Sequence, residues 1–314
     1  GFDVFDDSLL PWNLNLSQKR VRQLGRVFRL LRKTPYLPAD KLVDKASGWL
    51  REVESPFFLW VHFMDPHGPY QGPSCNYLDK YRAEKIWNKA VNRPEEVNPE
   101  EKEKLVGAYR EEVRFTDENV GRLLGSIDKR DENCFTCITA DHGEEFGEHG
   151  DYSHNPKCFE ELIHVPLVIR APGVTAGRRA EPVALLDIFP TVVEFAGLDP
   201  KKYDLDGQSL LRLLGGDSSS AREYVVSQPG SNEICLRSNR WKYVVKGSRE
   251  LLYDLENDPN ETEDKSSSEE EIVEKFRREL AGREDEFGAL PEDYMEPSEE
   301  EEETRRRLED LGYL

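Results

Sequence analysis

The spacing of apolar residues divides this chain into helical and strand-like stretches. Apolar positions recur at helical spacing in residues 17–32, 40–52 and 100–127, which predicts three amphipathic helices. Continuous apolar runs at 57–63 and 134–140 have the length and composition of buried strands, and 165–169 is a third predicted strand. Residues 183–199 indicate a turn that leads into a helix, with Pro190 near its first turn.

Other stretches show different patterns. Residues 75–98 are polar and punctuated by prolines, so we expect an irregular surface excursion or lid. A GGDSSS run marks a linker, and after residue 222 short strands separated by turns predict an antiparallel meander. From residue 266 the chain is strongly acidic with helical composition.

Composition limits the class of protein. The chain has 314 residues, enough for one large α/β domain and a smaller piece, and a formal net charge of −20. Such a charge disfavours nonspecific binding to nucleic acid or an anionic membrane, and no apolar run approaches the ~20 residues that cross a bilayer. Five cysteines without paired spacing favour a reducing compartment, so we expect a cytoplasmic protein. The sequence begins with Gly1 rather than Met, which weakens that expectation.

Two predicted strands end in residues that can carry chemistry. The run at 134–140 leads into Asp141 and His142, where a carboxylate beside an imidazole suits a divalent cation. The run at 57–63 leads into Asp-Pro-His-Gly-Pro, in which two prolines hold His67 on a stiff loop. Ligands of open α/β sheets bind at this end of the strands. The alternative for the first site is an acidic loop whose Glu144, Glu145 and Glu148 are merely solvated.

The segment at 140–150 has the sequence ADHGEEFGEHG. It resembles the metal-binding segment of sulfatases of the alkaline phosphatase superfamily, and further segments resemble that family in the same order along the chain. The resemblance implies an α/β sandwich with a central, mostly parallel sheet flanked by helices, here residues 1–218. It also implies a small antiparallel subdomain at 219–265, followed by the acidic helical tail at 266–314.

The resemblance also assigns roles to individual residues. Asp141 and His142 match the positions that bind the cation, usually calcium. His67 matches a histidine that contacts the sulfate ester and assists the leaving group. His154 and Lys157 are the candidates for a side chain that reaches the sulfate oxygens, His154 with a catalytic role and Lys157 in substrate binding. The implied substrate is a small-molecule or carbohydrate sulfate ester, and the oligomeric state stays open.

One expected feature is missing from the sequence. The family's nucleophile is a formylglycine made from the cysteine of Cys-x-Pro-x-Arg, and none of the five cysteines stands in that motif. The nucleophile and an Asp-Asp metal pair are therefore expected upstream of residue 1, and this polypeptide alone is expected to be inactive. The alternatives are a phosphodiesterase or phosphonate hydrolase of the same superfamily, or a sulfatase-like protein that has lost catalysis.

Overall fold

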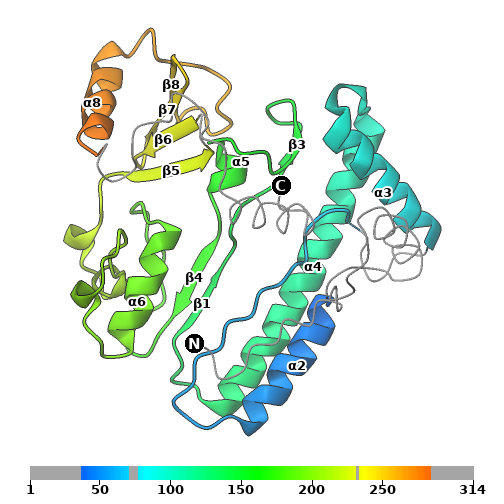
Figure 1. Cartoon of the computed structure of the whole chain (residues 1–314), viewed down its shortest axis with the longest axis vertical. Helices are drawn as coiled ribbons and strands as arrows, with labels where there is room; N and C mark the ends of the chain where they lie inside the picture. Colours follow the sequence, from blue (N-terminus) through cyan, green and yellow to red (C-terminus); the bar gives the residue numbers. More distant parts are fainter. Residues whose placement is uncertain (1–36, 71–76, 231–232, 284–314) are drawn as a thin grey trace, which may run out of the picture. The chain divides into compact units, whose positions relative to one another are not determined.

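The computed structural model describes residues 37–70, 77–230 and 233–283 (Figure 1). The predicted helix at 17–32 and the part of the acidic tail beyond residue 283 lie outside the described residues. The chain divides into two compact units, residues 1–134 and 135–314. The domain boundaries expected near residues 218 and 265 stay predictions. No helix in the described ranges combines the length and apolar character needed to cross a membrane.

Two long helices form the core of the first unit. The predicted helices are confirmed as α2 (Ala39–Glu52) and α4 (Pro99–Arg130), which pack against each other. Asn98 caps the start of α4: its side chain accepts a hydrogen bond from the Glu101 amide, and the Glu101 carboxylate accepts one from the Asn98 amide. The apolar faces of the two helices meet in a cluster whose buried members are Val43, Ala46, Leu50 and Leu123.

The described part of the region 75–98 is mostly helical, so the prediction of irregular structure there was wrong, while its role as a surface excursion or lid stays a prediction. Helix α3 spans Tyr77–Asn92, and a short 3-10 helix, η1 (Pro94–Glu96), connects it to α4. The prolines stand at the ends of this region, where they limit helices without interrupting them. Residues 77–92 contain several Ala, Lys, Glu and Arg residues, which favour helix.

The apolar run at 57–63 is extended, but it belongs to none of the three sheets in the described part of the chain. The strand prediction is wrong in this respect, because a strand also requires backbone hydrogen bonds to a neighbour. Burial alternates along the run as it does along a strand. Its inner residues pack on the α2–α4 cluster, namely Phe57, Leu59, Val61 and Phe63.

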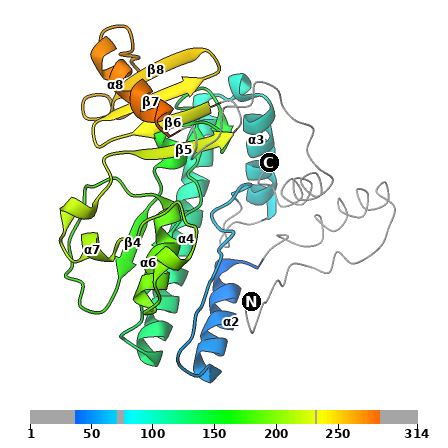
Figure 2. The same ribbon diagram turned by 60° about the vertical axis from the view of Figure 1, so that its left-hand side comes forward.

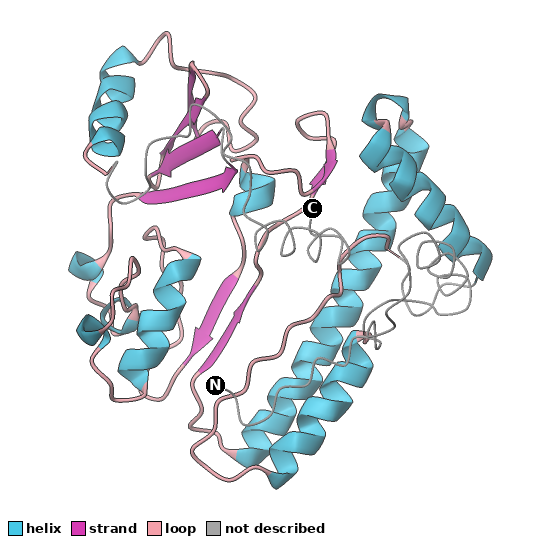
Figure 3. Cartoon of the chain, in the orientation of Figure 1, coloured by secondary structure: helices cyan, strands magenta, loops and turns pink. Residues whose placement is uncertain are grey.

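The second unit opens with two paired strands. The predicted strands are confirmed as β1 (Thr136–Thr139) and β4 (Leu167–Arg170), which lie side by side (Figure 3). Their pairing is antiparallel, as is every other strand pair among the described residues. The mostly parallel central sheet is therefore not observed there. The chain between β1 and β4 goes out and returns instead of crossing over; it contains the hairpin of β2 (Glu145–Phe146) and β3 (Tyr152–Ser153) and the short helix α5 (Glu160–Ile163).

A group of short helices follows β4. Buried Asp187 organises this group, because its carboxylate accepts hydrogen bonds from the amides of Ala184 and Gln208 and pairs with Arg222. The predicted helix at 183–199 is confirmed in outline, and Pro190 lies in its first turn. The elements are η2 (Leu185–Asp187), α6 (Ile188–Phe195), η3 (Pro200–Lys202), α7 (Leu211–Leu214) and η4 (Ser218–Ser220).

The predicted meander is confirmed as a four-stranded antiparallel sheet in the order β5-β6-β7-β8. Its strands are β5 (Val225–Gly230), β6 (Glu233–Arg237), β7 (Trp241–Lys246) and β8 (Arg249–Asp254), and helix α8 (Glu270–Ala281) covers one face (Figure 2). Successive residues of a strand point to opposite faces. The face against α8 has a buried apolar core of Tyr224, Leu236, Tyr243, Leu252, Val273 and Phe276. The other face buries Cys235, Val244 and Tyr253 together with Cys158, which precedes α5.

Candidate functional site

Asp141 and His142 follow directly after β1. The Asp141 carboxylate accepts a hydrogen bond from the His142 amide at 3.1 Å. The same carboxylate oxygen, Oδ1, lies 3.8 Å from Nε2 of the His142 ring. The other ring nitrogen, Nδ1, lies 2.8 Å from the Gly143 carbonyl oxygen. Because a carbonyl only accepts, Nδ1 carries the proton in the neutral ring and Nε2 presents its lone pair on the side of Asp141.

This donor pair fits a divalent cation. An oxygen and a nitrogen 3.8 Å apart can both bind one ion, and a second hydrogen bond that fixes the tautomer is typical of metal-binding histidines. The Asp141 side chain is more than half exposed, so an ion can reach it. The pair does not select calcium, since calcium prefers oxygen ligands and imidazole suits softer metals.

The loop that carries these ligands, residues 141–144, is held by the main chain of α5; we call it the metal loop. The amide of Gly143 donates to the Leu162 carbonyl at 2.7 Å, and the amide of Glu144 donates to the Glu161 carbonyl at 2.9 Å. This approach requires glycine at 143, because a Cβ there would lie 2.0 Å from the Glu161 carbonyl oxygen. The metal loop is therefore fixed by backbone contacts with residues 17 and 19 positions further along the chain.

His154 lies directly against His142. The two rings stack with their centroids 4.2 Å apart and their planes 28° from parallel. His154 Nδ1 lies 3.4 Å from a carboxylate oxygen of Glu144, and both side chains are nearly buried. The structure therefore brings three predicted site residues together within the second unit, namely Asp141, His142 and His154.

Lys157 lies among carboxylates. Its ammonium is 2.9 Å from Glu145 and 2.8 Å from Asp151. Burial alone would lower the Lys157 pKa, but the hydrogen bonds with Asp151 and Glu145 outweigh burial and raise the pKa above its ordinary value. Lys157 is therefore a cation at neutral pH, and its charge is balanced by the two carboxylates.

A second group of possible metal ligands consists of Glu145, His149 and Glu161. The Glu145 carboxylate is fully buried, and it already accepts hydrogen bonds from the amides of His149 and Asp151 and pairs with Lys157. His149 Nδ1 lies 2.6 Å from Glu161, and the ring stacks on Phe159. A cation there would compete with the Lys157 ammonium for the same carboxylate. We therefore interpret this group as structural and place the metal prediction at the Asp141–His142 pair.

His67 belongs to the first unit. Its amide donates to the Met64 carbonyl and its Nδ1 lies 2.7 Å from the Gly68 carbonyl oxygen, so the loop is a tight turn. Buried Asp65 accepts a hydrogen bond from the Ala39 amide at the start of α2. Burial raises the Asp65 pKa, and the amide of Ala39 opposes this effect. The approach of His67 to Asp141 and His142 stays a prediction.

The alternative of a merely solvated acidic loop is wrong for two of its three glutamates. Glu145 is fully buried and the side chain of Glu144 is 6% exposed, whereas Glu148 is exposed. The sequence interpretation also missed Glu160 and Glu161, which support the loop that carries Asp141 and His142. The only signal for them was their position after His154 and Lys157, because their partners are distant in sequence.

Family models match most of the chain. The sulfatase model matches residues 4–198, which is more than half of the sequence. This chain belongs to the sulfatase family. A second model, the C-terminal region of N-sulphoglucosamine sulphohydrolase, matches residues 147–286. This second match covers β3, α5 and the four-stranded sheet.

Curated relatives include a sulfatase of Formosa agariphila, 25% identical over 295 residues, which covers 83% of this chain and 57% of the relative. Arylsulfatase K of Rattus norvegicus is 28% identical over 269 residues, covering 69% of this chain and 47% of that protein. Choline-sulfatase of Rhizobium meliloti is 27% identical over 253 residues, covering 72% of this chain and 49% of that protein. The chain thus spans about half the length of the curated relatives it matches.

Solved structures support the alkaline-phosphatase-like sulfatase fold. The phosphonate monoester hydrolase of Agrobacterium radiobacter has a TM-score of 0.66 at 22% identity and covers 85% of this chain and 65% of its own. A structure in complex with its substrate D-glucosamine-2-N,6-O-disulfate has a TM-score of 0.59 at 18% identity, covering 82% of this chain and 72% of its own. At these identities the likeness concerns the fold alone.

Proposed function

We propose that this chain supplies the cation-binding loop and part of the sulfate-binding site of a sulfuric ester hydrolase. The observation that carries the proposal is the stacking of His154 on His142, beside the Asp141 carboxylate. Asp141 and His142 would hold the cation, with calcium as the expected ion. A cation bound there withdraws negative charge from the sulfate oxygens.

The proposal gives the polar side chains different roles. His154 has Nδ1 beside the Glu144 carboxylate, an arrangement that favours the imidazolium form, and in that form its Nε2–H would donate to an anionic ester. Lys157 is the weaker candidate for sulfate binding, because two carboxylates already balance its charge. His67 is proposed as the acid that assists the leaving group, since an imidazolium N–H can donate a proton to the departing oxygen. In the whole protein, β1 is proposed to belong to a mostly parallel central sheet.

The proposed nucleophile is a formylglycine outside these 314 residues, because no cysteine of the chain stands in Cys-x-Pro-x-Arg. This polypeptide alone is therefore expected to show no turnover of 4-nitrophenyl sulfate, whereas the full-length gene product turns it over. The proposed substrate class is a carbohydrate or small-molecule sulfate ester. It is supported by the arylsulfatase and choline-sulfatase relatives and by the fold likeness to a protein solved with a disulfated glucosamine.

The experiment that tests the metal site is a calorimetric calcium titration of the purified full-length gene product, which is expected to carry the Asp-Asp metal pair as well. Asp141→Asn should weaken binding by at least about 100-fold, because a carboxylate ligand is replaced by a neutral amide. Asp204→Asn, a change at an exposed acid of the same unit, is the matched control and should have no effect. Equal calcium affinity in the Asp141 variant and the unchanged chain would refute the assignment.

A second candidate function is phosphonate or phosphate diester hydrolysis. The fold likeness to the Agrobacterium radiobacter phosphonate monoester hydrolase favours it, since sulfate and phosphonate esters present similar oxygens. Comparing kcat/KM of the full-length gene product for 4-nitrophenyl sulfate and for a 4-nitrophenyl phosphonate monoester separates the two. A higher value for the phosphonate would replace the sulfatase proposal.

A further inference from the structure

The residues before and within α5 are fixed by the four-stranded sheet at points far along the chain. The Cys158 amide donates to the Glu233 carboxylate of β6 at 2.7 Å. The Cys158 carbonyl accepts a hydrogen bond from the Lys242 ammonium of β7 at 2.6 Å. The Glu160 amide donates at 2.7 Å to Glu261, which lies in the turn after β8. Both ends of this short segment, residues 158–160, are therefore held by side chains of the sheet and its following turn.

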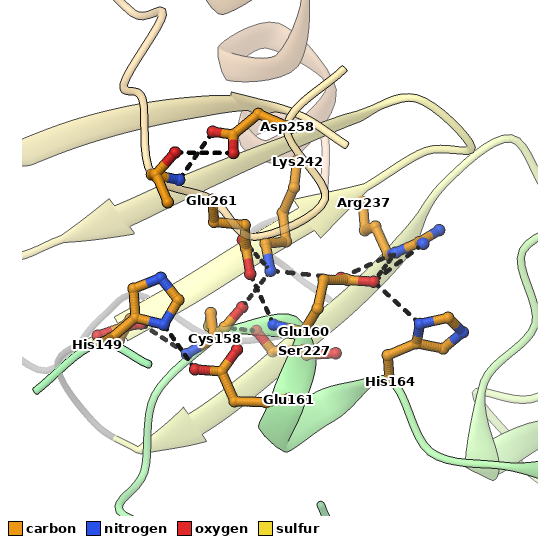
Figure 4. A network of polar contacts seen from close by, with 12 residues as sticks. His149, Cys158, Glu160, Glu161, His164, Ser227, Arg237, Lys242, Asp258 and Glu261 are labelled. Atoms are coloured by element: carbon orange, nitrogen blue, oxygen red, sulfur yellow. Dashed lines mark hydrogen bonds and ion pairs between the residues drawn. The ribbon is translucent and has the colours of Figure 1, made fainter. Parts of the chain in front are cut away.

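The Glu160 side chain adds a second set of contacts (Figure 4). Its carboxylate accepts hydrogen bonds from two nitrogens of the Arg237 guanidinium, Nε at 3.1 Å and Nη2 at 3.1 Å. It also lies 3.3 Å from the Lys242 ammonium. Lys242 is fully buried and also pairs with Glu261. We call Glu233, Arg237, Lys242 and Glu261 the polar brace.

The segment that the polar brace holds is the one that supports the site. The next residues, Glu161 and Leu162, provide the carbonyls that accept the amides of Glu144 and Gly143. The Glu161 carboxylate holds His149, and the Glu144 carboxylate faces His154. A chain of direct contacts therefore runs from β6 and β7 through α5 to the metal loop, all within the second unit.

We propose that the polar brace positions the metal loop, so that Arg237 and Lys242 are positioning residues for cation binding by Asp141 and His142. The role of the cation in this inference rests on the proposed function. The contacts between the polar brace, α5 and the metal loop are independent of that proposal. Four-residue α5 is too short to be stable alone, so its place depends on the contacts that hold it. Buried charged groups in such a network are also expected to fix one geometry.

Two variants test the proposal in the full chain, Arg237→Gln and Lys242→Met. Hydrogen exchange of the Gly143 and Glu144 amides reports the loop directly, and calcium titration reports the site. Arg237→Gln should accelerate exchange of both amides at least about 10-fold and weaken calcium binding about 10-fold, as loss of supporting contacts does at metal sites. Arg237→Lys keeps the charge and should give a smaller change in both. Arg237 is partly exposed, so this series is decisive even if Lys242→Met does not fold.

The matched control is Arg277→Gln. Arg277 makes the same two-nitrogen contact with a glutamate, Glu250, but on the α8 side of the sheet. The control should leave the Gly143 and Glu144 amides and the calcium affinity within about twofold of the unchanged chain. Equal effects of the two arginine changes, or no effect of Arg237→Gln on the loop amides, would overturn the proposal. Absence of calcium binding by the unchanged chain would count against the proposed function, while amide exchange would still decide whether the brace holds the loop.

Discussion

The two faces of the four-stranded sheet differ in chemistry. The face against α8 is closed by apolar side chains, with Phe276 in ring contact with Tyr224 and Tyr243. The face against α5 mixes buried Cys235 and Val244 with buried Lys242 and its carboxylate partners. Because neighbouring residues of β7 point to opposite faces, the sheet presents Tyr243 to one side and Lys242 to the other.

This difference in chemistry indicates that one face of the sheet mainly stabilises the fold and the other mainly positions α5. Apolar burial is non-directional, so the α8 face mainly contributes stability. Hydrogen bonds and ion pairs are directional, and they cost free energy when a partner is missing. The α5 face therefore holds α5 in one position, and α5 carries the carbonyls that hold the metal loop. The two faces should respond differently to substitution.

The largest effect is expected from Lys242→Met. The change leaves the buried Glu261 carboxylate without its cation and removes one of the cations beside Glu160, and removing one partner of a buried pair costs about 3–5 kcal/mol of unfolding free energy. Urea unfolding followed by circular dichroism measures the loss. Lys242→Met combined with Glu261→Gln should recover part of it, because one uncompensated carboxylate is removed. No recovery in the double variant would contradict the charge argument.

Phe276→Ala should cost a similar amount, about 3–5 kcal/mol, through the cavity left in the apolar core. Its effect on the site should nevertheless be small. Under native conditions the Gly143 and Glu144 amides should exchange as they do in the unchanged chain until the whole sheet opens. Phe276→Leu, which keeps most of the volume, should cost less than about 1.5 kcal/mol. A selective loss of protection at Gly143 would show that the two faces are not separate.

A smaller effect is expected from acid. The hydrogen bond from Arg240 lowers the pKa of Asp254 to about 2, and that from Arg277 lowers the pKa of Glu250 to about 2. The ordinary values are 3.8 and 4.5, so the stability from these pairs is fully present above about pH 4.5 and is lost as pH falls towards 2. Burial raises the pKa of Glu261, which acts in the opposite direction.

Thermal unfolding between pH 6 and pH 2.5 measures this acid effect. The melting temperature should fall steadily below about pH 4.5, and Asp254→Asn should make the fall shallower because one low-pKa group is removed. A melting temperature that stays constant down to pH 3 would contradict the prediction.

The smallest effect is expected from Arg277→Gln. Both Arg277 and its partner Glu250 are substantially exposed, so water and salt screen the pair. The melting temperature should change by less than about 2 °C, and by less still in 0.5 M KCl. A scan with and without salt checks this. A large loss would mean that the α8 face also depends on polar contacts.

Much of the fold could be predicted from local pattern. The helical spacing gave α2 and α4, the short apolar runs gave β1 and β4, and the alternation after residue 222 gave the meander. The wrong predictions concern the pairing of a strand with a neighbour and the effect of prolines on a nearby helix. Residues 57–63 have strand composition, but strand formation depends on a neighbour, and α3 was missed because its flanking prolines were taken for a broken segment.

The sequence alone supplied the candidate site residues, because Asp141 and His142 belong to one short recognisable segment and the family resemblance added His154. The tertiary structure decided how they are held. It places His154 on His142, balances Lys157 with two carboxylates and joins α5 to Arg237 and Lys242, 77 and 82 residues away. Such contacts depend on where the chain returns in space, and no local pattern of side chains records that.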